Sequence, residues 1–379
     1  MGRASERSEV KLRRIPLVKP YITEEVKVRV CEVLDSGYLT EGPVTKEFEE
    51  AFQKYIGCGH AIAVTSCTTG LEMVLRCMNI GPGDEVIVPD YTYPATASVV
   101  AIVGARPVIV DVSRDTMLID YNEIEKAITN NTKAIIPVSI FGNPLDYDQL
   151  AGIKQKYGVY IIEDAACSIG AEYKGVKVGN LADISVFSLH PRKFITTGEG
   201  GMVTTNNAEW KNWIESYKHF GMGKADSREG TIFERIGTNY KLSNILAAIG
   251  LCQMQKIDQL LARRIELSEN YIHLLKNNPK VSLPKTTDNG KHSWQSFCIF
   301  VKNRDTVMRR MREIGIEVQI GTYSLHMHPA FSNDEVCTLV GDMTGSKYAF
   351  KHCLALPLYH ELSEADQHYV VENLCSLLK

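Results

Sequence analysis

The sequence contains no apolar run long enough to cross a bilayer. Its longest apolar region, residues 95–110, is interrupted by Gly104, Arg106 and Pro107, which excludes a membrane-spanning helix there. The first 14 residues are polar and basic and lack the apolar core of a secretory signal, and we expect residues 1–15 to be flexible. The formal net charge of the 379 residues is only −3, so neither nucleic acid nor an acidic membrane is expected as a partner.

No two of the ten cysteines form a Cys-x-x-Cys pair, so zinc ribbons and thioredoxin-type redox motifs have no support. Scattered single cysteines are typical of reduced thiols, and we therefore expect a cytoplasmic protein. Hydrophobic residues make up 44% and charged residues 23% of the chain. This is the composition of a soluble globular enzyme or binding protein.

From about residue 60, short apolar segments alternate with helical patterns. The expected strands are 61–64, 85–89, 107–111, 134–140, 159–164 and 184–187, and the helices expected between them are 69–78, 94–103, 121–128 and 147–157. Two amphipathic helices, 24–35 and 44–55, are expected before them. This alternation predicts an α/β fold with a mostly parallel sheet covered by helices on both faces. Ligands of such sheets bind at the carboxyl ends of the strands.

The pattern changes in the last third of the chain. A long helix is expected from Ser243 to about Leu275, and a break at 279–284 follows it. Shorter strands and helices come next, and the last helix begins with a capping box at Ser363 and Asp366. The expected organisation is a flexible N-terminus (1–15), a large α/β domain (16–255) and a small C-terminal α+β domain (256–379).

A loop with a single lysine lies between two apolar segments at residues 188–201. It contains Pro191, three glycines and Lys193. Glycines let the backbone approach a ligand closely, and a lysine shielded from water in such a loop has a lowered pKa and attacks carbonyl groups. The alternative is a surface lysine in a glycine-rich hairpin, and this segment alone favours that alternative.

An aspartate and a capped helix start follow two other expected strands. Asp164 ends an apolar segment, where an unpaired carboxylate would be costly. It could face the protonated nitrogen of a pyridoxal phosphate (PLP) ring or cap the next turn. Ser66 and Thr68 precede a helix that a capping box at Thr69 and Glu72 is expected to begin. Such a start is a phosphate site or simply a capped helix.

An aromatic residue completes the set. Tyr93 follows the expected strand 85–89, where its ring could stack on a cofactor; a core tyrosine is the alternative. Each of these signals is weak alone. A phosphate site, a stacking ring, a buried carboxylate and a lysine, in this order on an α/β pattern, together predict a PLP site.

These segments resemble the DegT/StrS-type sugar aminotransferases. The resemblance runs from about Ile15 to the C-terminus, and its motifs are 42–49, 81–89, 92–97, 163–166, 188–201, 237–243 and 356–359. It implies the fold-type I architecture of the aspartate aminotransferases, with a mostly parallel seven-stranded sheet flanked by helices and a smaller α+β C-terminal domain.

The resemblance also implies a role for each matching residue. Lys193 is implied as the catalytic lysine that binds PLP as a Schiff base, Asp164 as the partner of the pyridinium, and Tyr93 as the stacking ring. The other cofactor-binding residues implied are Ser66, Cys67, Thr68, Cys167, Ser188 and Asn239. Because Asn239 resembles a residue that reaches the phosphate of the other subunit, a homodimer with shared active sites is implied.

Two positions depart from the family pattern. The family commonly has glycine at Cys67, so cysteine requires a backbone there that is not restricted to glycine. It commonly has glutamine at Cys167, where it contacts the ring hydroxyl, and a thiol is a weaker partner. Lys193 is retained, whereas related dehydratases carry histidine there, which favours amino transfer. We expect the free Lys193 to be near-neutral beside a protonated Schiff base.

The resemblance implies a reaction in amino sugar biosynthesis, from L-glutamate, which leaves 2-oxoglutarate, to a nucleotide-linked keto sugar. Loop 195–201 resembles members that aminate the 4-position, so a 4-keto-6-deoxy sugar is expected. The expected substrate-binding residues are His190, Tyr323 and His326; no metal is expected, because no carboxylate or cysteine cluster supports the His-x-His spacing. The alternatives are a 3-keto sugar or keto-cyclitol aminotransferase and a non-catalytic PLP-fold protein with a regulatory or binding role.

Overall fold

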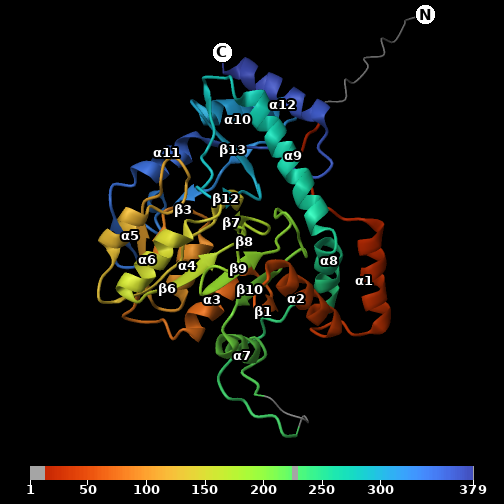
Figure 1. Ribbon diagram of the computed structural model, residues 1–379, viewed down its shortest axis with the longest axis vertical. Coiled ribbons are helices and arrows are strands. Elements are labelled where there is room, and N and C mark those ends of the chain that lie inside the picture. Colours follow the sequence, from red (N-terminus) through yellow and green to blue (C-terminus); the bar gives the residue numbers. More distant parts are fainter. Residues whose placement is uncertain (1–12, 224–228, 379) are drawn as a thin grey trace, which may run out of the picture.

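The computed structural model describes residues 13–223 and 229–378. Its largest sheet has the strand order β1-β10-β9-β6-β5-β2-β4-β16. Figure 1 labels β1, β6, β9 and β10 of this sheet. The strands are β1 (His60–Val64), β2 (Glu85–Pro89), β4 (Arg106–Val110), β5 (Thr132–Ile135), β6 (Tyr160–Asp164), β9 (Ile184–Ser188), β10 (Gly201–Thr205) and β16 (Thr338–Val340). All pairs from β9 to β16 are parallel, and β10 is antiparallel to both of its neighbours. The predicted mostly parallel sheet is confirmed.

The sheet is 8-stranded, whereas seven strands were expected. The additional strand, β16, comes from the C-terminal part of the chain and runs parallel to β4, with Leu339 opposite Ile109. It is only 3 residues long, too short for an alternating pattern to reveal it in the sequence. The division of the chain into two domains at residue 255 stays a prediction. One strand of the large sheet, β16, lies beyond residue 255.

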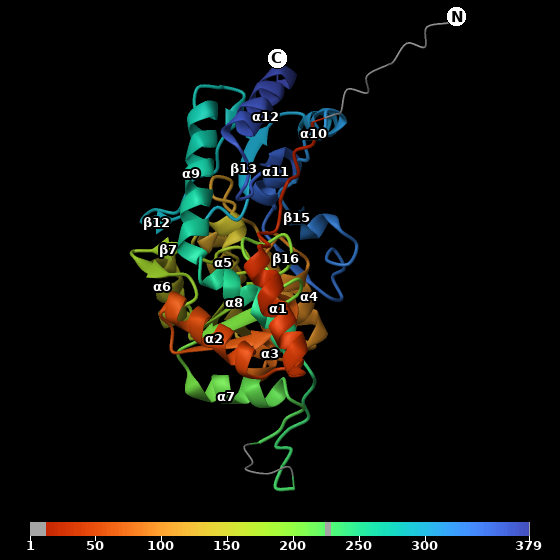
Figure 2. The same cartoon turned by 90° about the vertical axis from the view of Figure 1, so that its right-hand side faces the viewer.

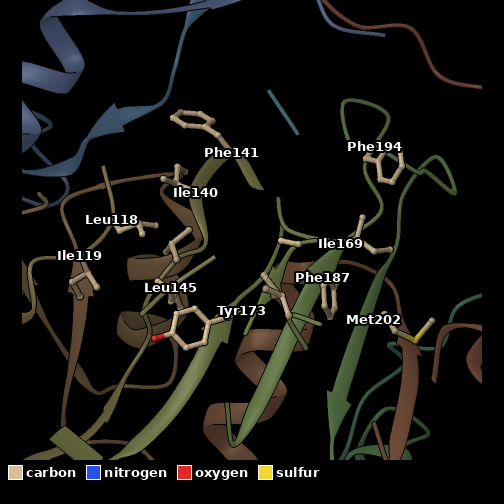
Figure 3. Close-up of a cluster of buried hydrophobic side chains, with 14 of the residues drawn as sticks. Leu118, Ile119, Ile140, Phe141, Leu145, Ile169, Tyr173, Phe187, Phe194 and Met202 are labelled. Carbon is tan, nitrogen blue, oxygen red and sulfur yellow. The ribbon is translucent and has the colours of Figure 1, made fainter. Parts of the chain in front are cut away.

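Helices cover both faces of the sheet, and alternate residues of a strand enter two separate cores. In β1, Ala61 and Ala63 belong to one core and Ile62 and Val64 to the other, because successive side chains of a strand point to opposite faces. The first core, part of which is drawn in Figure 3, includes α2 (Pro43–Ile56), α5 (Tyr121–Ala127), α6 (Tyr147–Tyr157) and α8 (Asn244–Met254). The second includes α3 (Cys67–Cys77), α4 (Ala95–Ile102) and α7 (Ala208–Tyr217), while α1 (Glu24–Ser36) packs on α8.

The C-terminal part forms an antiparallel sheet at the end of the molecule opposite α7 (Figure 2). Its order is β11 (Val281–Ser282), β13 (Phe297–Val301), β17 (Cys353–Leu356) and β14 (Gln319–Ile320). With α9 (Ile257–Leu275), α10 (Arg304–Glu313) and α12 (Glu364–Leu377), it surrounds a third core. The remaining elements are α11 (Thr344–His352), the sheet β12 (Gly290–Lys291), β7 (Glu172–Tyr173) and β8 (Val176–Lys177), the pair β15 (Tyr323–Ser324) and β3 (Tyr91–Thr92), and two 3-10 turns, Ile140–Gly142 and Leu325–Met327.

Helix boundaries differ from the expectation in one long element. The single helix expected from Ser243 to about Leu275 is two helices, α8 and α9, because Lys256 between them leaves the helical region at φ −114° and ψ 11°. The last helix begins at Ser363 as expected, since Ser363 Oγ accepts a hydrogen bond from the N–H of Asp366 and donates to the Asp366 carboxylate over 2.7 Å. Across residues 13–223 and 229–378, no helix combines the length and the apolar character that crossing a bilayer requires.

Candidate active site

Four strand ends meet at one edge of the large sheet. β6 and β9 end there with Asp164 and Ser188, β1 leads into the turn at Ser66, and the antiparallel β10 begins there at Gly201. These four strands are neighbours in the order β1-β10-β9-β6. Predicted site residues from distant segments are therefore brought together at the carboxyl edge of the sheet, where α/β proteins bind ligands.

The carboxylate of Asp164 is buried and held by three donors. The residue is 5% exposed; Thr96 Oγ1 donates to Oδ2 over 2.8 Å, the N–H of Ala166 donates to Oδ1 over 3.1 Å and the Cys67 thiol donates to Oδ1 over 3.9 Å. Burial raises the pKa of Asp164, and the three hydrogen bonds and the charge of Lys193 reverse this rise only in part. The ionised carboxylate is thus an anion that a cationic ligand group can stabilise.

The amine of Lys193 faces a thiol. Lys193 lies half-buried in the loop between β9 and β10, and its Nζ is 3.1 Å from Cys167 Sγ. Burial lowers the pKa of Lys193, but Cys167 and Asp164 outweigh burial and raise the pKa above its ordinary value. The near-neutral Lys193 expected beside a protonated Schiff base stays a prediction, because in the polypeptide alone the groups that face Nζ are acidic.

Helix α3 begins at the site, three residues earlier than expected from its capping box. Ser66 is the N-cap and exchanges hydrogen bonds of 3.1 Å with Thr69. The predicted box of Thr69 with Glu72 is wrong, because the Glu72 carboxylate instead accepts from Arg76 over 2.8 Å and from Tyr240 over 3.1 Å. The N–H groups of the first turn, which have no acceptor within a helix, therefore belong to residues 67 and 68.

The start of α3 lies directly against the start of β10. A Cβ atom on Gly201 would lie 2.6 Å from the carbonyl carbon of Ser66 and 2.7 Å from the nitrogen of Cys67. Cys67 has helical backbone and is absent from the residues with positive φ, so the position does not require glycine. Its thiol is 8% exposed and lies 3.9 Å from Asp164 Oδ1; burial raises the pKa of this thiol.

Tyr93 is not a core residue. Its side chain is 65% exposed, and its ring centroid lies 6.3 Å from that of Tyr323. The two rings meet because β3 pairs with β15, with Tyr323 opposite Thr92. The structure thus joins the predicted stacking ring and a predicted substrate residue that are far apart in the sequence.

His326 is held by a buried carboxylate. Its Nδ1 lies 2.7 Å from Asp90 Oδ2, and its N–H donates to Asp90 Oδ1 over 2.7 Å. Asp90 is fully buried, and within the described residues the other ring nitrogen of His326, Nε2, has no hydrogen-bond partner. The imidazole is therefore held in one orientation, and its unpaired Nε2 is buried.

The remaining predicted residues have local contacts. The N–H of His190 lies 3.5 Å from Ser188 Oγ, and Nδ1 of His190 accepts from the N–H of Arg192 over 3.2 Å. His190 thus stabilises the turn before Lys193. Asn239 is exposed, accepts from Lys241 Nζ over 2.7 Å and pairs with His219 in an isolated β-bridge, and neither partner is another candidate residue.

Two residues that hold predicted site residues in place were not themselves predicted from the sequence. Thr96 and Asp90 both lie in the segment that contained Tyr93, but only the aromatic ring was given a role. Asp90 follows a buried strand directly, the same signal that identified Asp164. Thr96 carried no such signal, because its contact joins positions 68 residues apart.

The donor set fits PLP. First-turn N–H groups and hydroxyls at the start of α3 suit a phosphate, and the buried carboxylate of Asp164 suits a ring cation. The amine of Lys193 suits a covalent link to a carbonyl group. The absence of a side chain at Gly201 leaves the first turn of α3 close to β10, so the three groups face one edge of the sheet.

Comparisons with known proteins agree with this chemistry. Residues 20–375 match the DegT/DnrJ/EryC1/StrS aminotransferase family. The spore coat polysaccharide biosynthesis protein SpsC of Bacillus subtilis is 33% identical over 379 residues, 96% of this chain and 97% of that protein, and the uncharacterized protein MJ1066 of Methanocaldococcus jannaschii is 36% identical over 365 residues, 93% and 94% of the two chains. The PLP-form structure of the putative sugar aminotransferase Spr1654 from Streptococcus pneumoniae superposes with a TM-score of 0.89 at 30% identity, over 96% of this chain and 98% of that one.

The raised pKa of Asp164 predicts that the cofactor-free protein loses folding stability as the pH rises. Because the folded pKa lies above the unfolded value, the free energy of unfolding falls as the pH rises through the folded pKa. Asp164→Asn should remove this fall and stabilise the cofactor-free protein by roughly 1 kcal/mol at neutral pH, while weakening PLP binding. Urea unfolding, measured from about pH 4, near the ordinary pKa of an aspartate, up to about pH 8, follows this fall.

Asp111→Asn is the matched control, because Asp111 is also buried but accepts hydrogen bonds from the N–H groups of Val112, Gly345 and Ser346. This variant should be less stable than the wild type throughout the pH range. An Asp164→Asn protein that is no more stable than the wild type at neutral pH would contradict the prediction that the ionised Asp164 destabilises the fold.

Proposed function

Since the chain belongs to the DegT/DnrJ/EryC1/StrS aminotransferase family, we propose that it transfers the amino group of L-glutamate to the 4-position of a nucleotide-linked 4-keto-6-deoxy sugar. The enzyme is a PLP-dependent aminotransferase. The observation that supports the proposal best is the meeting of Lys193, Asp164 and the start of α3 at one sheet edge. All ten cysteines are free, which supports a reducing, cytoplasmic location.

The proposal assigns each part of PLP to side chains at this edge. When bound, PLP supplies an electron sink for the carbon that carries the transferred nitrogen. Asp164 holds the ring nitrogen as a cation, and Tyr93, whose exposed ring can still gain a partner, covers a face of the ring. The phosphate goes to Ser66, the N–H groups of Cys67 and Thr68, the Thr68 hydroxyl and Ser188.

Lys193 has two tasks in this proposal. Its Nζ binds the cofactor covalently, and once freed it takes a proton from the α-carbon of the donor amino acid. The raised pKa of Lys193 means that the amine begins protonated and must lose a proton before it can react. Cys167 stands where the family pattern has a glutamine, and here its thiol contacts Nζ over 3.1 Å.

The sugar is proposed to bind beside Tyr93, toward Tyr323 and His326. Tyr323 contacts the Tyr93 ring. Asp90 holds one ring nitrogen of His326, and the other, Nε2, is buried without a partner among the described residues, so that a sugar oxygen reaching it would satisfy it. Loop 195–201, which resembles members that aminate the 4-position, favours that position over a 3-keto sugar or a keto-cyclitol. His190 lies one turn before Lys193 and is proposed to border the same space.

A homodimer is proposed because an apolar arm extends from the body of the protein. The arm (residues 218–223 and 229–240) links α7 to α8 and points away from the large sheet (Figures 1 and 2). It exposes Phe233 at 60% and Ile236 at 97%, and exposed apolar clusters of this kind mark interaction surfaces. A second copy is the proposed occupant, because the arm also carries Asn239, the residue assigned to the partner's phosphate site.

Lys193→Ala tests the amino transfer itself. Without Nζ, no covalent link to PLP can form and no group carries the proton, so the variant should lose turnover by at least about a thousandfold. The wild type should convert L-glutamate to 2-oxoglutarate in a half-reaction that changes the absorbance of the bound cofactor. Borohydride reduction followed by mass spectrometry should find a fixed adduct on the wild type alone. A wild type that binds PLP without this half-reaction would instead favour a regulatory or binding protein.

A panel of keto sugars tests the proposed substrate. The amine-loaded wild type should react faster with nucleotide-linked 4-keto-6-deoxy sugars than with 3-keto isomers or keto-cyclitols, by about tenfold or more in kcat/KM. His326→Ala should raise KM for the sugar while leaving the glutamate half-reaction unchanged, because Nε2 is assigned to the sugar alone. Preference for a 3-keto sugar would replace the proposed position with the alternative.

Charges on the arm test the dimer. The double variant Phe233→Asp, Ile236→Asp places carboxylates on the proposed contact, where burial without a partner is costly. Sedimentation analysis should find the wild type at twice the mass of this variant, and the variant should lose activity together with the dimer. Ile102→Asp, at a residue of α4 that is 58% exposed, is the control and should remain dimeric. A fully active monomer would contradict the assignment of Asn239.

A further inference from the structure

Lys193 lies in a loop, and the two peptide groups beside it are gripped by one buried side chain. Gln295, which is 5% exposed, accepts a hydrogen bond from the N–H of Phe194 at Oε1 and donates from Nε2 to the carbonyl of Arg192, each over 2.7 Å. The amide therefore contacts the residue before Lys193 and the residue after it. Such a double contact fixes both the position and the direction of the backbone at Lys193.

A second buried glutamine holds the same loop three residues later. Gln253 of α8, which is 1% exposed, accepts from the N–H of Thr196 over 3.1 Å and donates to the carbonyl of Thr196 over 2.6 Å. Its Nε2 also donates to the carbonyl of Ile249 within α8 over 2.9 Å, which fixes the amide on its own helix. The loop is thus anchored from two elements that lie far from it in the sequence.

Gln295 is itself held in place. Arg264 of α9 donates from Nη1 to the carbonyls of Trp294 and Gln295, each over 3.0 Å, and its guanidinium lies 5.1 Å from the centroid of the Phe194 ring. Phe194 is drawn on its loop in Figure 3. Trp294 has a φ of 55°, a conformation that is sparsely populated for residues other than glycine and that gathers at functional sites.

These contacts meet a geometric need of the reaction. The lysine side chain has four rotatable bonds, and the loop that carries it has no ladder of strand hydrogen bonds at residues 192–196. Reacting atoms must be held close to their attack geometry, and a displacement of about 1 Å lowers rates by about a hundredfold. Precise sites are supported by buried partners of the residues that react.

We propose that Gln295 is a positioning residue for Lys193, and that with Gln253 and Arg264 it forms a clamp that holds Nζ where it attacks the cofactor. The inference rests on the proposed function, because it takes Lys193 as the residue that binds PLP. The clamp acts on the backbone of the loop and touches neither substrate nor cofactor. If the clamp acts in this way, removing Gln295 should slow the reaction of Nζ with the cofactor by more than the loss of folding stability explains.

Gln295→Met tests the clamp, with Gln367→Met as the matched control. Gln367 is another fully buried glutamine that donates to the carbonyl of Leu267 and accepts from Asn270, each over 2.8 Å, but it lies away from the loop. Both variants should lose stability. Only Gln295→Met should slow covalent PLP attachment, measured by borohydride trapping at timed intervals, by about a hundredfold. Attachment at the wild-type rate in Gln295→Met would overturn the proposal.

The pH dependence of PLP attachment in Gln295→Glu distinguishes a positioning role of Gln295 from a merely structural one. An ionised glutamate accepts from Phe194 but repels the carbonyl of Arg192, whereas a protonated one can again accept and donate. Attachment should therefore recover toward the wild-type rate as the pH falls in Gln295→Glu and stay slow at every pH in Gln295→Met. Equal pH profiles for the two variants would overturn the proposal. If Gln295→Met does not fold, Gln253→Met is measured in its place and should slow attachment by about tenfold.

Hydrogen exchange separates a failed clamp from a failed function. In the cofactor-free protein, the amides of residues 189–198 should exchange faster in Gln295→Met than in the wild type and Gln367→Met. Unchanged exchange there overturns the clamp even if the wild type transfers amino groups. A wild type that binds no PLP refutes the proposed function, while faster exchange in Gln295→Met still supports the clamp.

Discussion

A buried carboxylate whose charge is only partly compensated is the constraint on which the site depends. Asp164 ends a strand inside the sheet, and three hydrogen-bond donors and the charge of Lys193 stabilise its charge only in part. A fold tolerates such a group where a ligand supplies the missing charge. The neighbouring strand ends then limit what this ligand can be, because they add a helix start suited to a phosphate and an amine at the same edge.

Much of this arrangement is predictable from the sequence, because its signals are local. The strands around the site are short apolar runs, and Asp164 and Lys193 stand out as charged residues beside them. Helix α3 is predicted correctly, but its start is not: Ser66 and Thr69, like Thr69 and Glu72, have the spacing of a capping box. Folding chooses the first pair, because Glu72 bonds to Arg76 and to the distant Tyr240.

What the sequence does not reveal depends on contacts between distant segments. The bond from Thr96 to Asp164, the pairing of β3 with β15 and the grip of Gln295 on the Lys193 loop join residues with no common pattern. The raised pKa of Lys193 has the same origin, since it follows from the nearby Cys167 thiol and Asp164 rather than from the loop. Local motifs pick out the candidate site residues, and tertiary contacts set their protonation and orientation.

The late strand β16 has a consequence for synthesis. Because β4 takes its outer partner from residues 338–340, a growing chain leaves the ribosome with the apolar β4 as an open edge while more than two hundred residues are still to be made. Unpaired parallel edges are templates for association with other chains. The growing polypeptide is therefore most exposed to aggregation before its last tenth emerges, and holdase chaperones that cover this edge during translation should raise its yield.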